Sequence, residues 1–156
     1  MEQVFSTLTI KSSGKGFNDI TDKIREFLCD NNFSSGIIIL NLLHTSCSLT
    51  INENADPNVL KDLERYIEGI VPYNCYQDLT NNKDNVYYEH FQEGEDDMPA
   101  HIKTALTNNS LSLSFQNEKL ILGTWQSIYI WEHRFHIKER KLNLHIIGEK
   151  RKNTYN

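Results

Sequence analysis

The stretch Gly36-Ile37-Ile38-Ile39-Leu40-Asn41-Leu42-Leu43 decides the fold of this chain. Its side chains are apolar at both alternating sets of positions, and the run is too short to be a buried helix. Such a segment is typical of a strand that is covered on both faces, near the centre of a sheet. We therefore expect the chain to be built around a central strand that ends at His44.

Segments of other periodicity lie on both sides of this strand. Residues 4–11 alternate as in a half-buried strand, and residues 12–16 form the turn after it. Three amphipathic helices are expected: one with its stripe at Ile20, Ile24, Phe27 and Leu28, one after Asp56-Pro57, and one with Pro99 in its first turn. Further strands are expected at 110–115, 119–122, 127–132 and 141–147, whereas residues 72–92 read as a long loop. This order predicts an α+β domain with mostly antiparallel sheet.

Length and charge limit the class of protein. A chain of 156 residues is near the size of one domain, and we expect a single domain over 1–150 followed by a polar tail over 151–156. The net charge of -5 at pH 7, with dispersed basic residues, excludes a typical nucleic-acid-binding protein. Three scattered cysteines and the lack of a long apolar run predict a cytoplasmic protein with no membrane contact.

The stretch from Glu93 to Lys103 carries the densest cluster of chemically useful groups. Three acids in a row, Glu95, Asp96 and Asp97, precede the helix that contains Pro99, and His101 follows. An acidic helix cap explains one carboxylate, because acids are favoured at helix N-termini. Three carboxylates beside an imidazole are also the material of a metal site or a general acid/base pair.

Polar groups also gather after the central strand, from His44 to Pro57. His44 either ends the strand as a structural residue or serves as a ligand, and these two readings stay open. Cys47 is expected to pack at the wall of a pocket and not to act as a nucleophile. Asp56 reads as the N-cap of the helix that begins at Pro57.

Two shorter segments late in the chain are ambiguous. Residues 123–126, Gly-Thr-Trp-Gln, either grip a polar ligand or form a tight turn with Trp125 in the core. Residues 132–136 contain an acid, two imidazoles and a guanidinium. Alternation along a strand prevents all four from facing one site, so one of them is expected to be structural.

Several blocks resemble the successive signatures of the YjbQ family, also called secondary thiamine-phosphate synthases. They are His44-Thr45-Ser46-Cys47-Ser48-Leu49, Asn52-Glu53-Asn54-Ala55-Asp56-Pro57, Tyr88-Glu89-His90, the Glu93–Lys103 stretch, Gly123-Thr124-Trp125-Gln126 and Glu132-His133-Arg134. The resemblance covers nearly the whole chain. It implies a sandwich of two sheets, a homotrimer, a polar pocket that binds metal, and a thiamine phosphate synthase activity as a secondary function.

The site residues expected from these blocks fall into three groups. The catalytic group is Glu53, Asp96, Asp97 and His101. The substrate-binding group is Asn54, Lys103, Trp125, Gln126 and Arg134, with Lys103 and Arg134 as phosphate contacts. The metal ligands are His44, His101 and His133, with His90 and His136 in reserve.

The chemistry leaves the metal and the reaction open. Joining an aminopyrimidine methyl diphosphate to a thiazole phosphate releases pyrophosphate, which calls for Mg²⁺ or cationic side chains. The carboxylates suit Mg²⁺ and the imidazoles suit Zn²⁺, so the divalent metal is undecided. A metal-dependent hydrolase and a non-catalytic trimer that binds a metal or a small phosphorylated metabolite are the alternatives.

Overall fold

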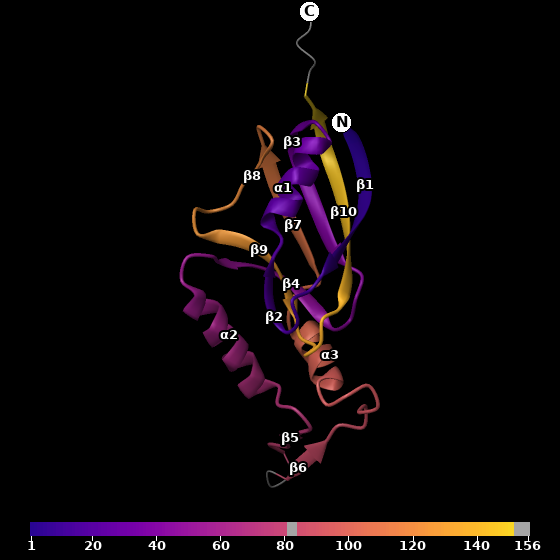
Figure 1. Ribbon diagram of the computed structural model, residues 1–156, viewed down its shortest axis with the longest axis vertical. Helices are drawn as coiled ribbons and strands as arrows, with labels where there is room; N and C mark the ends of the chain where they lie inside the picture. Colours follow the sequence, from indigo (N-terminus) through magenta and orange to yellow (C-terminus); the bar gives the residue numbers. More distant parts are fainter. Residues whose placement is uncertain (81–83, 152–156) are drawn as a thin grey trace, which may run out of the picture.

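A computed structural model describes residues 1–80 and 84–151 of the chain (Figure 1). The helices are α1 (Thr21–Asp30), α2 (Pro57–Ile70) and α3 (Asp97–Leu106). The strands are β1 (Glu2–Lys11), β2 (Gly16–Asp19), β3 (Phe33–Leu42), β4 (Cys47–Glu53), β5 (Cys75–Gln77), β6 (Asn85–Tyr87), β7 (Ser110–Gln116), β8 (Lys119–Leu120), β9 (Gln126–Glu132) and β10 (Glu139–Lys150). The predicted α+β class with mostly antiparallel sheets is confirmed.

The larger sheet has five strands in the order β1-β10-β3-β7-β8, all antiparallel. β3 therefore lies at its centre, as the run Ile37–Leu43 predicts. Its even-numbered side chains face the core, where Ile38 and Leu40 are fully buried, whereas Ile37 is exposed on the outer face. The prediction that both faces are covered is thus wrong for the single chain.

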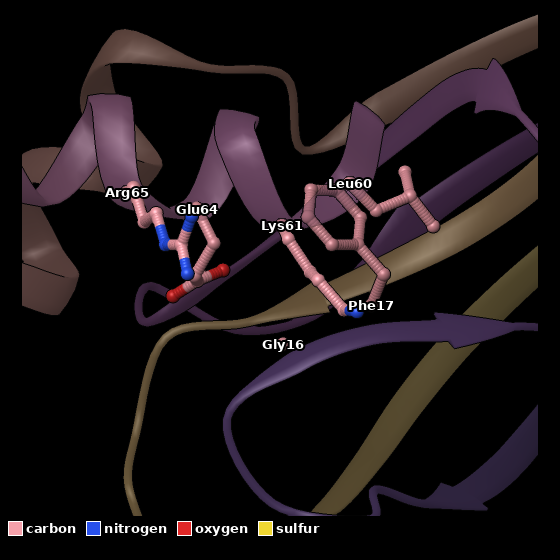
Figure 2. Close-up of a pocket in the computed structure, with 6 residues that line it drawn as sticks. All are labelled: Gly16, Phe17, Leu60, Lys61, Glu64 and Arg65. Carbon is pink, nitrogen blue, oxygen red and sulfur yellow. The ribbon is translucent and has the colours of Figure 1, made fainter. Parts of the chain in front are cut away.

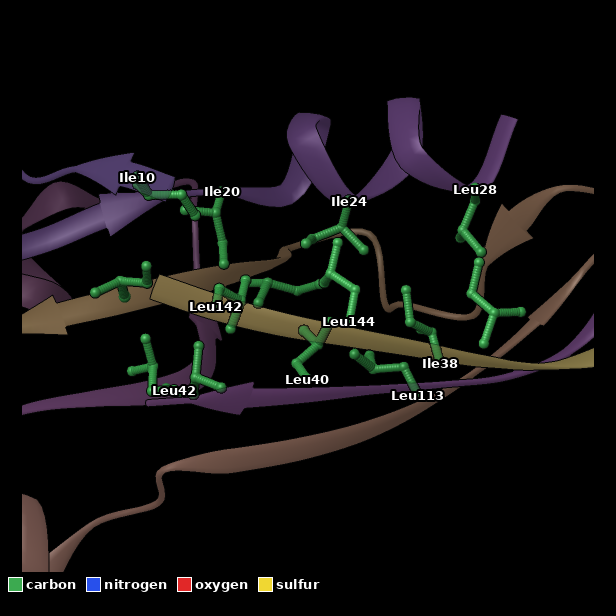
Figure 3. Close-up of a cluster of buried hydrophobic side chains, with 14 of the residues drawn as sticks. Ile10, Ile20, Ile24, Leu28, Ile38, Leu40, Leu42, Leu113, Leu142 and Leu144 are labelled. Atoms are coloured by element: carbon green, nitrogen blue, oxygen red, sulfur yellow. The ribbon is translucent and has the colours of Figure 1, made fainter. Parts of the chain in front are cut away.

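The core fills the space between this sheet, α1 and the smaller sheet β2-β9-β4. Figure 3 shows Ile24 and Leu28 of α1 pointing toward the large sheet, whose strands carry Leu40 and Leu144. Leu49 of β4 and the alternate side chains of β9, Ile128 and Ile130, belong to the same cluster. The two sheets therefore enclose one core, as in the sandwich that the family resemblance implies.

Three local expectations are corrected. Gly16, which was expected at the end of a turn, begins β2 (residues 16–19), which pairs with β9, and Asp19 then accepts the Thr21 backbone N–H at 2.9 Å. The supposed loop 72–92 contains the hairpin β5–β6. The hairpin strand predicted over 119–122 is shorter, since β8 ends at Leu120, although the Ile121 N–H still donates to the Ser114 carbonyl at 2.9 Å. The cap at Asp56 is confirmed by its 2.8 Å hydrogen bond from the Asn58 N–H.

Of the predicted tail over 151–156, the structure describes Arg151, whose N–H donates to the Asn32 carbonyl at 2.8 Å. Residues 152–156 lie outside the described residues. Over the described part of the chain, no helix has the length and apolar character needed to cross a membrane.

Candidate metal centre

The start of α3 forms a cluster of ionisable side chains with the segment that follows β9. Asp96 and Asp97, the last residue before α3 and its first, are both buried. Among the described residues, the Asp96 side chain makes no capping hydrogen bond. The acidic-cap reading is therefore wrong for it, because both carboxylates turn toward side chains elsewhere in the fold.

Asp97 lies between two imidazoles. Its Oδ2 is 2.6 Å from Nε2 of His90, which precedes α3, and 3.8 Å from Nε2 of His101, one helical turn further on. Residues four apart on a helix share a face, which explains why the Asp97 and His101 side chains meet. The two imidazole side chains are 48% and 36% exposed, so one side of this group faces solvent.

The His101 ring is oriented by the backbone. Its Nδ1 lies 2.9 Å from the carbonyl oxygen of Thr45, which can only accept a hydrogen bond. Nδ1 therefore carries the proton, and Nε2 presents its lone pair beside Asp97. A backbone carbonyl that fixes the tautomer in this way is usual for metal-binding histidines.

Arg134 holds the two carboxylates from the buried side. Its Nε donates to Asp96 Oδ2 at 3.1 Å, its Nη1 pairs with Asp97 Oδ1, and its Nη2 donates to the Glu93 carbonyl at 2.7 Å. The Phe135 N–H also donates to Asp96 Oδ2, at 2.7 Å. These contacts leave Asp97 Oδ2 as the oxygen directed at the imidazoles.

The donor set fits a transition metal better than a magnesium ion. One ligand atom each from His90, Asp97 and His101 lies within 4.8 Å of the other two. Two imidazoles and one carboxylate suit zinc and similar ions, whereas Mg²⁺ favours oxygen donors only. Three protein ligands with a solvent-facing side leave coordination positions for other molecules.

The comparison with known proteins decides the family. The model of the family described as "UPF0047 protein YjbQ-like" matches residues 6–149. The chain belongs to the YjbQ family.

Two named relatives and one solved structure align with most of the chain. The UPF0047 protein YjbQ of Salmonella typhimurium is 43% identical over 144 residues, which are 92% of this chain and 96% of that protein. The UPF0047 protein YugU of Bacillus subtilis is 33% identical and covers 83% of this chain and 89% of its own. A crystal structure of a YjbQ/UPF0047 protein from Clostridium acetobutylicum has a TM-score of 0.75 at 31% identity, over 91% of this chain and 99% of that one.

The three histidines predicted as a metal set are not the group that this YjbQ chain assembles. Among the described residues, the candidate group contains His101 together with His90 and Asp97. His44 instead accepts the Lys141 backbone N–H on its Nε2 at 2.6 Å, a contact that the structural reading of His44 expects. His133 is fully buried, with its Nε2 2.8 Å from Ser48 Oγ.

A chain of hydrogen bonds fixes the His133 tautomer. Thr107 Oγ1 donates to the Lys103 carbonyl at 2.7 Å, so it accepts from Ser48 Oγ, which in turn accepts from His133 Nε2–H. His133 Nδ1 is left with a bare lone pair and no partner among the described residues. Burial, assisted by the Lys103 charge, lowers the pKa of His133 to about 3, so the ring is neutral near pH 7.

The two predicted phosphate contacts point inward. Arg134 is buried and occupied by Asp96 and Asp97. Lys103 is fully buried, donates to the Tyr73 hydroxyl at 3.4 Å, and has its pKa lowered by burial. Both predicted phosphate contacts are therefore engaged inside the single chain, and their role toward a phosphate stays a prediction.

The remaining predicted residues, Glu53, Asn54, Trp125 and Gln126, lie at the other end of β9. Glu53 pairs with Gln126, whereas the group of His90, Asp97 and His101 is tied through Arg134 to the opposite end of β9, just past Glu132. Gln126 and Glu132 are six positions apart along the strand, which is about 20 Å at ~3.3 Å per residue. Asn54 is nevertheless held there by Ser127 Oγ at 3.1 Å, and Trp125 is 63% exposed, contrary to its core reading. One chain does not bring these four to the candidate ligand group.

His90 was expected only as a reserve metal ligand. The feature of the sequence that pointed to it was its place in the Tyr88-Glu89-His90 block. Cys47 is buried in the core, and burial raises the pKa of its thiol to about 12. The thiol therefore stays protonated near pH 7, which agrees with the expectation that it is not a nucleophile.

Proposed function

We propose that this YjbQ-family chain is a metal-dependent enzyme that holds a divalent ion of the zinc type with His90, Asp97 and His101. The observation that carries the proposal is the approach of three ligand atoms within 4.8 Å of one another on a solvent-facing surface. When bound, such an ion supplies a Lewis acid that polarises a phosphoryl or carbonyl oxygen or activates water. Arg134 fixes Asp97, and the Thr45 carbonyl fixes His101, so the chain positions the ligands beforehand.

Hydrolysis is the reaction class that this geometry favours. A site with three protein ligands and an open side needs only water and a substrate oxygen, and no further cation from the chain. The thiamine phosphate synthase activity implied by the family resemblance is our second proposal. It requires charge compensation for released pyrophosphate, and the two cationic side chains expected for that task, Arg134 and Lys103, are buried.

Metal content tests the proposal directly. We expect elemental analysis of the purified protein to give about one zinc-type ion per chain, removable by a chelator and restored by Zn²⁺ but not by Mg²⁺. The restored protein should hydrolyse members of a panel of phosphate esters. Pyrophosphate release from the two thiamine precursors without ester hydrolysis would favour the second proposal. A bound metal with neither activity would leave a non-catalytic binding role.

We further propose that the protein is a homotrimer with a pocket shared between subunits. The apolar side chains of β9 and β10 are mostly buried within the chain, but Phe5, Ile37 and Leu43 remain exposed. A closed ring can cover such surfaces. It can also bring Glu53, Asn54, Trp125 and Gln126 of one subunit to the α3 start of the next, where a small phosphorylated metabolite would bind.

Mass in solution tests this assembly. Light scattering at micromolar concentration is expected to give about three times the 18.2 kDa chain mass. A monomer that binds metal and substrate fully would contradict both the trimer and the shared pocket.

A cytoplasmic location completes the proposal. Cys29, Cys47 and Cys75 are all unpaired, which suits a reducing compartment.

A further inference from the structure

The two supports of the proposed metal ligands come from loops. The Thr45 carbonyl, which orients His101, lies between β3 and β4, and Arg134, which holds Asp97, lies between β9 and β10. Residues outside strands are not held by the regular hydrogen bonds of a sheet. Other contacts therefore have to fix the places of the two loops that carry these supports.

The buried ion pair of Glu132 and Arg140 has a fixed geometry. Glu132 is the last residue of β9 and is fully buried, and Arg140, near the start of β10, is 5% exposed. Arg140 Nε donates to Glu132 Oε2 at 2.7 Å, and Arg140 Nη2 donates to Glu132 Oε1 at 2.5 Å. Two parallel hydrogen bonds hold the guanidinium in one orientation relative to the carboxylate.

Each member of the pair also bonds to one of the loops. Glu132 Oε1 accepts the backbone N–H of Arg134 at 3.0 Å. Arg140 Nη2 donates to the Ser46 carbonyl at 3.4 Å, next in the chain to the carbonyl of Thr45. One ion pair therefore joins the two loops that hold the proposed metal ligands.

Stability alone gives no reason for placing two charges here. Apolar residues of similar volume in place of a buried ion pair often leave a protein equally stable or more stable. Apolar side chains, however, neither accept the Arg134 N–H nor donate to the Ser46 carbonyl, so both loop attachments would be lost. The property that the charged pair adds is a fixed separation of the two loops.

We propose that Glu132 and Arg140 are positioning residues of the metal centre. They hold the two loops at the separation at which Asp97 and the two imidazoles can share one ion, and neither belongs to the ligand group itself. This inference rests on the proposed function, because it presupposes that the ligand group binds zinc. It adds to that function a buried support that acts on the ligands through both loops.

The double variant Glu132→Leu and Arg140→Met tests this role. It lacks both loop attachments but leaves no unpaired charge, so it should fold. Competition titration with a chromogenic chelator is expected to give about 10- to 100-fold weaker zinc binding, the effect of changing the outer partners of a metal site. Urea denaturation of the same protein separates this loss from a loss of stability. Unchanged zinc affinity in the folded variant would overturn the proposal.

Arg140→Lys tests the same role with the charge retained. Lysine keeps a cation beside Glu132, so no carboxylate is buried without a counter-ion, but its ammonium lacks the planar fork of arginine. We expect zinc binding to be weaker by about 3-fold or more, because at least one hydrogen bond to Glu132 or to Ser46 is lost. Wild-type affinity would mean that the charge suffices without the fixed geometry, which contradicts a positioning role.

Glu64→Gln is the matched control. Glu64 projects from α2 toward β2 (Figure 2), and its side chain is 17% exposed. Its Oε2 accepts the Trp131 indole N–H at 2.5 Å and its Oε1 faces Lys15 Nζ at 3.7 Å, so within the described residues it bonds to neither loop. The change removes a largely buried carboxylate charge beside β9 and should leave zinc affinity unchanged. An equal loss in this control and in the double variant would reduce the effect to a general disturbance of β9 and refute the positioning role.

Wild-type protein and His101→Ala separate this inference from the proposed function. If wild-type protein binds zinc and His101→Ala does not, while the double variant binds as tightly as wild type, only the positioning role is wrong. If wild-type protein binds no zinc, or if His101→Ala binds it equally well, both proposals are wrong.

Discussion

Replacing Glu132 by alanine is expected to lower the free energy of unfolding by about 3–5 kcal/mol. Glu132 is fully buried at the end of β9. Its Oε1 accepts from Arg140 Nη2 at 2.5 Å and from the Arg134 N–H at 3.0 Å, while its Oε2 accepts from Arg140 Nε at 2.7 Å. Removing the carboxylate leaves the buried Arg140 charge without its counter-ion, and this uncompensated charge causes most of the loss.

Urea denaturation of the variant and its controls measures this effect. Glu139→Ala removes an exposed carboxylate from β10 and should change stability by less than about 0.5 kcal/mol. Glu132→Leu combined with Arg140→Met should recover most of the loss, because replacing both buried charges by apolar groups is often neutral. A loss below about 1 kcal/mol in Glu132→Ala would mean that water reaches Arg140.

The strands and helices with strong periodicity could be predicted because burial of their apolar side chains dominates their formation. β3, β7 and β10 alternate or run apolar along their length, and burial of one face sets their positions in the sheet. β2 and the β5–β6 hairpin were missed, since they are three or four residues long and polar. Pairing with neighbours, rather than a side-chain pattern, makes these segments strands.

The site was only partly predictable because sequence does not show which polar atoms the fold uses internally. Asp97 and His101 could be identified from their spacing on one helix. His44 and His133 are equally good ligands by residue type, but a backbone N–H occupies His44 Nε2, and His133 is fully buried with its Nε2 bound to a serine hydroxyl. Arg134 was expected to contact substrate, yet it neutralises the carboxylates that the same prediction left unpaired.

Removing either proposed imidazole ligand is expected to weaken zinc binding by more than about 100-fold. Changes to the outer partners of a metal site already reduce affinity by about 10- to 100-fold, and loss of a ligand removes a metal bond itself. His90→Ala and His101→Ala are the informative variants, because neither side chain is buried and folding should survive. Asp97→Ala is less suitable, since it also leaves Arg134 short of a partner. Competition titration with a chromogenic chelator measures the affinities.

His44→Ala and His136→Ala test whether zinc is held by His90, Asp97 and His101 or by the histidines expected from the sequence. His136 is exposed, so its loss should leave zinc affinity unchanged and serves as the matched control. His44→Ala removes the acceptor of the Lys141 N–H and should affect stability more than affinity, because its Nε2 is already occupied by that donor. If His44→Ala weakened zinc binding as strongly as His101→Ala while His90→Ala did not, the ion would be held by the other histidines. The proposed metal centre at the start of α3, and hydrolysis at that centre, would then be wrong.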